Sequence, residues 1–255
     1  MRIPKITGII RRRFLLNYRV RPEVIEKIVP SPFRPKLKNG YAVAGICLIR
    51  LEKIRPVYVP SVFGISSENS AHRIAVEWDE EVETKEGVFV PRRDTDSPIN
   101  ALAGGRIFPG VHRRANFQIS DNQGKVAMKV TERGSEKLLL EFEGEENGQF
   151  PAGSIFENLA ESSAFFQSGR IGYSPRTDGL KLEGLLLKTI EWKVSPLSIS
   201  KIRSAYFDDC TLFPPETIAF DHALLMRDVV HEWHSEPTIA TGSTFNRVRS
   251  TAQEG

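Results

Sequence analysis

The chain has 255 residues, of which 40% are hydrophobic and 26% are charged, and these proportions exclude a disordered or fibrous protein. Its 35 basic and 32 acidic residues give a formal net charge of +3, which argues against nucleic acid or a membrane surface as a general partner. No apolar run approaches the roughly 20 residues that a membrane-spanning helix requires.

Short strands dominate the elements that the sequence predicts. Nine segments are rich in β-branched residues or alternate between apolar and polar residues, and each is bounded by Gly, Pro, Asn or Asp. A hairpin turn is expected at residues 120–124, between two of them. The predicted strands are residues 14–20, 41–51, 73–82, 87–91, 116–120, 125–132, 137–143, 185–194 and 217–220.

Two helices are predicted. Residues 22–28 start with a proline, which favours the first helical turn, and end before Pro30. Residues 154–166 start at Ser154, with Glu157 three positions later in the spacing of a capping box. Many short strands with few helices predict a mainly β (α+β) fold.

One domain is expected over residues 1–240, because no repeat or linker-like change in composition divides the chain, and residues 241–255 are expected to form a flexible tail. The basic residues 11–13 are not followed by an apolar segment of signal-peptide length. Cys47 lies in an apolar run, which favours a small buried side chain, and nothing calls for a disulfide with Cys210. A cytoplasmic location is the simplest inference.

Three segments resemble known proteins in their order and spacing. Residues 17–33 predict a strand, a short helix and a Pro-Ser-Pro turn, and residues 105–115 contain Gly-Arg-Ile-Phe-Pro-Gly before a basic pair. Residues 220–228 begin with Phe-Asp-His-Ala, and a His-Glu-Trp triplet follows at 231–233. The chain resembles the acetoacetate decarboxylase superfamily, and these segments look most like the uncharacterised DUF2071 (YqjF-like) proteins.

The resemblance implies an antiparallel β-barrel with a few short helices and a ligand cavity inside it. In the superfamily, one lysine attacks a ketone after a neighbouring lysine has lowered its pKa. At the two aligned positions this chain has Arg113 and Arg114. A guanidinium stays protonated and does not form an imine, so Schiff-base chemistry at this position is not expected.

The resemblance also implies candidate ligand-binding residues. Arg11 aligns with a substrate-binding arginine, within an arginine triplet that allows a shift of one or two positions, and Glu68 could stand in for a glutamate of the family. Arg113 or Arg114 could bind a carboxylate or phosphate, but neighbouring residues of a strand face opposite sides, so at most one reaches a cavity. His112 could act as an acid or base near neutral pH, or only cap a turn.

The histidines near the carboxyl end suggest a metal site, but their spacing matches no recognised motif. His231 and His234 are three residues apart, one fewer than the zinc motif His-Glu-x-x-His requires, and His222 follows Asp221 directly. No metal and no cofactor are therefore predicted, and a metal enzyme that uses the three histidines is kept as a third hypothesis.

Two functional hypotheses lead. The first is a protein that binds or transforms a small anionic or carbonyl-bearing compound in the cavity, with a lyase-like activity and no Schiff base if it is an enzyme. The alternative is a catalytically inactive interaction or assembly module on the same fold, consistent with a homo-oligomer. An open cavity on which arginines converge would favour the first hypothesis, and a sealed apolar core with Arg113 and Arg114 at the surface would favour the second.

Overall fold

The computed structural model describes residues 5–104, 109–146, 148–176 and 178–241. They form one large sheet with a few short helices, which confirms the predicted mainly β fold, and none of these helices is long and apolar enough to cross a membrane. The strands are β1 (Ile6–Val20), β2 (Arg34–Pro35), β3 (Leu37–Lys38), β4 (Tyr41–Pro56), β5 (Ile65–Glu80), β6 (Glu83–Thr95), β7 (His112–Asn122), β8 (Lys125–Glu132), β9 (Leu138–Glu145), β10 (Ile171–Pro175), β11 (Lys181–Thr189), β12 (Ser195–Ser204) and β13 (Ile218–Ala240). The helices are α1 (Pro22–Ile25), α2 (Pro98–Ala103), α3 (Leu159–Ser168) and the 3-10 helix η1 (Ser61–Phe63).

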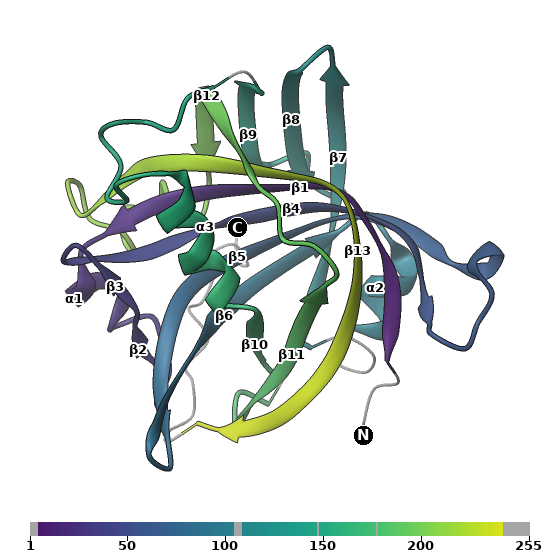
Figure 1. Ribbon diagram of the computed structural model, residues 1–255, viewed down its shortest axis with the longest axis horizontal. Helices are drawn as coiled ribbons and strands as arrows, with labels where there is room; N and C mark the ends of the chain where they lie inside the picture. Colours follow the sequence, from purple (N-terminus) through teal and green to yellow (C-terminus); the bar gives the residue numbers. More distant parts are fainter. Residues whose placement is uncertain (1–4, 105–108, 147, 177, 242–255) are drawn as a thin grey trace.

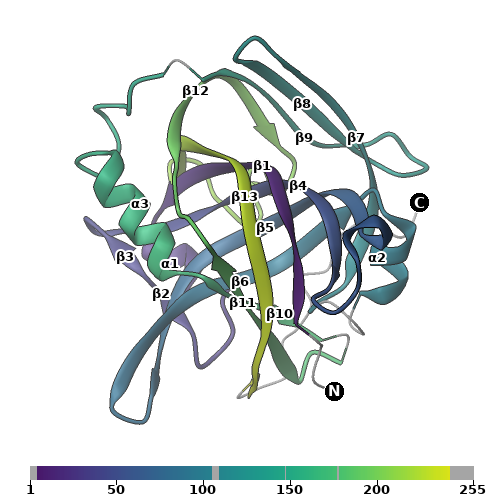
Figure 2. The same ribbon diagram turned by 45° about the vertical axis from the view of Figure 1, so that its right-hand side comes forward.

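The sheet closes on itself twice, so that five long strands belong to two closed circuits. Strands β13, β1, β4, β5 and β6 lie side by side in that order. Strands β10 and β11 connect β6 to β13 on one side, and β7, β8, β9 and β12 connect the same two strands on the other. These two groups lie on opposite sides of the five shared strands (Figures 1 and 2).

The sheet forms an approximate barrel, as expected, but it is not antiparallel throughout. Strand β6 pairs in parallel with both β7 and β10. A parallel pair needs a crossover connection, and here α2 lies between β6 and β7, while α3 directly precedes β10. The chain thus reaches β10 only after β7, β8, β9 and α3.

The shared strands present a different face to each circuit. Side chains alternate along a strand, so Phe14 and Leu16 of β1 face the larger circuit, whereas Arg13 and Leu15 face the smaller one. Phe14 packs against Phe142 of β9 with the ring centroids 5.1 Å apart. The larger circuit is filled by this apolar core, whereas the smaller one contains a cavity.

The helices differ from the predicted ones at their ends. Helix α1 ends at Ile25 and not at residue 28, and α3 begins after Asn158, whose Oδ1 accepts a hydrogen bond from the Glu161 amide at 3.0 Å. The predicted cap, Ser154, instead donates to Asp221 Oδ2 at 2.6 Å. The Ser154 hydroxyl, which the local spacing assigned to the helix cap, therefore bonds to a carboxylate that is distant in the sequence.

Several strands are longer than predicted and include polar residues that pair with other side chains. Strand β1 begins at Ile6 and β5 at Ile65, and β13 runs as far as Ala240. Arg11 and Arg12 of β1 form ion pairs with Glu52 of β4 and Glu68 of β5, and these charged residues conceal the apolar alternation that marks a strand. Of the predicted tail, residues 242–255 lie outside the described residues.

Two buried histidines link the stability of the fold to pH. His72 is 3% exposed and its ring lies 4.6 Å from that of Tyr206, and burial lowers its pKa to about 4. Burial likewise lowers the pKa of His231 to about 4. Both side chains are therefore neutral in the folded protein at a pH where the unfolded chain binds protons.

We expect the free energy of unfolding to decrease as the pH falls from about 6.5 to about 4. The unfolded state binds more protons in this range, so each histidine contributes a slope of up to about 1.4 kcal/mol per pH unit. Urea unfolding at three pH values in this range measures the slope, and His72→Phe should reduce it. An unchanged slope in the variant would contradict this origin.

Candidate ligand-binding site

A cavity of about 150 Å³ lies in the smaller circuit of strands. All seven strands of that circuit, β1, β4, β5, β6, β10, β11 and β13, contribute residues to its lining, and Phe166 of α3 closes one side. Most of the wall is apolar. The apolar side chains are Ile49, Leu51, Ala71, Val88, Val90, Pro109, Phe166, Leu185, Leu187, Trp192 and Trp233.

Four arginines line this cavity: Arg170, which precedes β10, and three that lie on different strands. Arg13 on β1 donates from Nε to Cys47 Sγ at 3.1 Å, and Arg93 on β6 donates from Nε to Ser174 Oγ at 3.1 Å. Arg73 on β5 is the third and is only 4% exposed. Within the described residues, none of the three forms an ion pair with a carboxylate.

Arg73 is the most enclosed of these charges. Its guanidinium carbon lies 4.6 Å from the centroid of the Phe166 ring, and Nη2 donates to Asn17 Oδ1. Its buried Nε has no hydrogen-bond partner among the described residues. Burial lowers the pKa of Arg73 and of Arg93 to about 10, so both remain positively charged at pH 7.

The carboxylate in the described lining does not neutralise these arginines. Asp94 accepts a hydrogen bond from Arg92 Nη2 at 3.0 Å and another from Ser70 Oγ at 3.0 Å. Because Asp94 is paired with an arginine that does not line the cavity, Arg13, Arg73 and Arg93 leave the interior positive. A cavity lined by positive charges without carboxylate partners favours an anion.

A chain of buried hydrogen bonds extends from Arg73 through Asn17 and His222 to Asp221. Asn17 Nδ2 lies 3.0 Å from His222 Nε2, and His222 Nδ1 lies 2.6 Å from Asp221 Oδ2. Asp221 also accepts from Ser154 Oγ and from the Ile155 amide. Burial alone would raise the pKa of Asp221, but these hydrogen bonds lower it, so it is a carboxylate at pH 7.

The chemistry of these groups fixes where the protons are. A guanidinium only donates, so Asn17 turns Oδ1 to Arg73 and its Nδ2 donor to His222 Nε2. His222 Nε2 is therefore the acceptor, and Nδ1 carries the proton that it donates to Asp221. Burial lowers the pKa of His222, in agreement with a neutral ring. The relay Arg73–Asn17–His222–Asp221 thus links a buried cation to a buried anion.

Ser162, His222 and Asp221 resemble a catalytic triad in their residue types, but their role is structural. Ser162 Oγ lies 2.8 Å from His222 Nε2, within the range of a catalytic triad. However, Ser162 is 0% exposed and does not line the cavity, so a substrate has no access to it. The contact instead holds α3 against β13.

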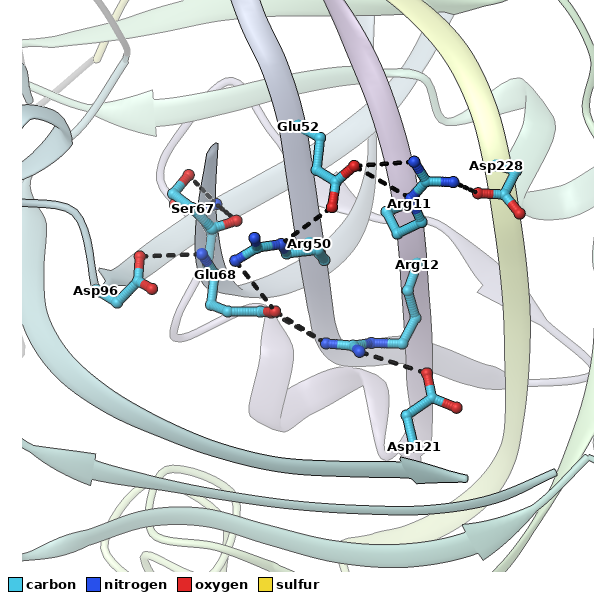
Figure 3. Close-up of polar contacts among 10 residues, drawn as sticks. Arg11, Arg12, Arg50, Glu52, Ser67, Glu68, Asp96, Asp121 and Asp228 are labelled. Carbon is cyan, nitrogen blue, oxygen red and sulfur yellow. Dashed lines mark hydrogen bonds and ion pairs between the residues drawn. The ribbon is translucent and has the colours of Figure 1, made fainter. Parts of the chain in front are cut away.

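Two of the residues predicted as ligands point away from the cavity. Arg11 is exposed and pairs with Glu52 and Asp228, whereas Glu68 pairs with Arg12 at 3.0 Å (Figure 3). Side chains alternate along β1, so Arg12 lies on the opposite face from Arg13. Burial raises the pKa of Glu68, although the Arg12 charge opposes this effect. The arginine of the triplet that lines the cavity is Arg13, two positions beyond Arg11.

The basic pair of β7 lies outside the cavity lining, but the preceding histidine belongs to it. His112 lines the cavity, and its Nδ1 lies 3.3 Å from the carbonyl oxygen of Asn100. Burial lowers the pKa of His112 to about 4, so it is neutral at pH 7. Arg113 is exposed and Arg114 half-buried, and Arg106 lies outside the described residues.

The three histidines considered for a metal do not come together. His222 bonds to Asp221, His234 lies 2.8 Å from Glu232, and His231 packs against Trp233. In the part of the chain that the structure describes, no group of three or more His, Cys, Asp or Glu side chains is placed to hold a metal ion.

Arg73 and Arg93, which the sequence-based candidates did not include, do have a weak signal in the sequence. Arg73 directly precedes the apolar run 74–76, where a solvent-facing arginine is out of place. Arg93 lies in residues 91–98, whose two prolines and two aspartates are typical of a turn and do not indicate a strand. A charged residue within a buried strand is a better indication of a site than a basic triplet.

The buried ion pair between Arg12 and Glu68 should contribute far more to stability than the exposed pair of Arg11. Arg12→Met leaves Glu68 buried beside only Arg50, and we expect a loss of about 3–5 kcal/mol in the free energy of unfolding. Arg11→Met is the matched control and should leave the urea midpoint nearly unchanged. Equal losses in both variants would contradict the difference in burial.

Comparison with solved structures shows one fold throughout. The acetoacetate decarboxylase of Legionella pneumophila matches with a TM-score of 0.63 at 13% identity, over 94% of this chain and 89% of that one. The enduracididine biosynthesis enzyme MppR complexed with pyruvate matches with a TM-score of 0.58 at 9% identity, over 95% and 91%. An acetoacetate decarboxylase-like enzyme from Sphingomonas wittichii RW1 matches with a TM-score of 0.55 at 11% identity, over 93% and 91%.

At these identities the likeness establishes the fold alone. No curated protein matches the chain. A family model does match: DUF2071, described as an uncharacterized conserved protein, covers residues 10–219. The chain therefore belongs to the DUF2071 family and has the acetoacetate decarboxylase-like fold.

Proposed function

We propose that this protein binds a small carboxylate in the cavity of the smaller circuit, through Arg13, Arg73 and Arg93. The observation that carries the proposal is that these guanidinium groups line one cavity without a carboxylate partner in the described residues. A ligand carboxylate would accept charge-assisted hydrogen bonds there, including one from the unpartnered Nε of Arg73. The related fold of MppR, solved with pyruvate, supports a ligand of this kind.

The proposal includes no Schiff base. The described lining of the cavity contains no lysine, and arginine is not a usable amine at physiological pH. Guanidinium groups stabilise negative charge that develops on an oxygen atom, so the same site suits a lyase-type reaction through an enolate.

An interaction module is the second candidate, and one surface favours it. The turn between β4 and β5 exposes Tyr58, Val62 and Phe63, which are 76%, 80% and 71% accessible. Large apolar side chains grouped on one turn are typical of contact surfaces between proteins. Self-association through this turn is compatible with an occupied cavity, so the ligand experiment tests the carboxylate proposal alone.

Thermal denaturation with small 2-oxo acids, hydroxy acids and sugar acids tests the carboxylate proposal. A ligand at about 100 times its Kd should stabilise the protein by about 2.7 kcal/mol. Arg73→Gln should weaken binding at least about tenfold, because a charge-assisted hydrogen bond is worth about 1.5–3 kcal/mol. The exposed Arg34, paired with Glu77 and Asp79, provides the control Arg34→Gln, which should bind like the parent.

Three results would count against this site. If no acid stabilises the protein, the interaction module becomes the better hypothesis. If Arg73→Gln binds like the parent, the ligand lies elsewhere. If Arg113→Gln or Arg114→Gln alone abolishes binding, the basic pair predicted from the sequence holds the ligand instead.

A further inference from the structure

The lining of the cavity includes a free thiol. Cys47 of β4 lines the cavity and forms no disulfide, and it is 7% exposed. The other cysteine of the chain, Cys210, is exposed and directly follows Asp208 and Asp209. The two thiols therefore have opposite electrostatic surroundings, one among arginines in a cavity and the other beside carboxylates at the surface.

The pairing of the strands places Cys47 among arginines of three other strands. Cys47 is opposite Ala71 of β5, which is in turn opposite Arg93 of β6. Arg73 lies two residues from Ala71, so its side chain is on the same face of the sheet. Arg13 of β1 donates from Nε to Cys47 Sγ at 3.1 Å, and the charges of Arg73 and Arg93 act on the same sulfur. Positive charge thus surrounds the sulfur.

The guanidinium of Arg73 independently indicates an anion beside this thiol. Arg73 lines the cavity and is 4% exposed, and its buried Nε has no hydrogen-bond partner among the described residues. A buried charged donor without a partner is unfavourable, and a ligand carboxylate that accepts from it would remove the penalty. Because Cys47 shares that face of the sheet, a carboxylate held there has its remaining atoms beside the sulfur.

We propose that Cys47 is a nucleophilic thiol that reacts selectively with small carboxylates that carry an electrophilic carbon. The arginines hold the carboxylate, and the sulfur attacks the electrophilic carbon. Electropositive surroundings of this kind are typical of reactive cysteines. The proposal rests on the proposed carboxylate site and adds a covalent step to it.

Iodoacetate serves as the reagent that reports this step. The Cys47 sulfur forms a bond to the methylene carbon while the carbon–iodine bond breaks. Iodide leaves with the bonding electrons, and the thiol proton passes to water, so the step requires no oxidant or reductant. Iodoacetamide undergoes the same displacement and is nearly the same size, but it carries no charge. The difference between the two reagents therefore measures the effect of the arginines.

Mass spectrometry of the folded full chain, treated with each reagent at the same pH, gives the alkylation rate at each cysteine. We expect the ratio of the iodoacetate rate to the iodoacetamide rate to be at least about tenfold higher at Cys47 than at Cys210, because charge-assisted hydrogen bonds hold only the acid. Acetate should slow the alkylation of Cys47 and leave that of Cys210 unchanged, whereas acetamide should slow neither.

Arginine variants localise the effect. Arg73→Gln and Arg93→Gln should each lower the rate ratio at Cys47 at least about threefold, since the remaining arginines still hold part of the charge. Arg34→Gln, at an exposed ion pair far along the sheet edge, is the control and should leave the ratio unchanged. The acetate measurement uses the parent chain, so it tests the proposal even if neither cavity variant folds.

Two results would overturn the reactive thiol. One is an equal rate ratio at the two cysteines, and the other is a Cys47 that neither reagent alkylates while Cys210 reacts. If small acids still raise the thermal denaturation temperature in either case, the carboxylate site stands without a covalent step. If no acid does so, the site itself is overturned as well.

Discussion

The buried charge of Arg73 is the constraint on which the cavity depends. A guanidinium that is 4% exposed carries a large desolvation cost, and no carboxylate in the described residues touches it directly. The compensation comes from Asn17, from the ring of Phe166 and from Asp221 through His222. Helix α3 supplies Phe166 and contacts His222 through Ser162, so its position also contributes to the compensation of the buried charge.

Close packing of the strands makes this arrangement around Arg73 possible. A Cβ atom at Gly45 would lie 2.4 Å from the Leu16 carbonyl oxygen and 3.3 Å from Arg73 Nη2. Glycine at position 45 thus lets β1 and β4 approach closely beside the Arg73 side chain. Successive side chains of β1 alternate between the two faces of the sheet, so Arg12 lies on the opposite face from Arg13 and pairs there with Glu68. The adjacent residues Arg12 and Arg13 therefore have separate roles: Arg12 is structural, and Arg13 faces the cavity.

The sequence predicts the strand content and the fold family well, and it predicts the site incompletely. Apolar alternation identifies strands such as residues 125–132, which correspond closely to β8. The arginine triplet indicates the right part of β1, with Arg13 as the member that reaches the cavity. Arg73 is different, because what makes its burial tolerable is Asn17, 56 residues away, together with His222 on the last strand. Such support is three-dimensional and leaves no local pattern.

The direction of the hydrogen bonds in the relay has an evolutionary consequence. Asn17 satisfies a donor on one side and an acceptor on the other, so it is matched to both neighbours at once. A homologue that replaces His222 with a side chain that only donates would turn the Asn17 amide around and set its Nδ2 against Arg73. Positions 17, 73 and 222 are therefore expected to covary as one unit of selection. Their joint retention would mark the members of the family that keep a buried cation at this cavity.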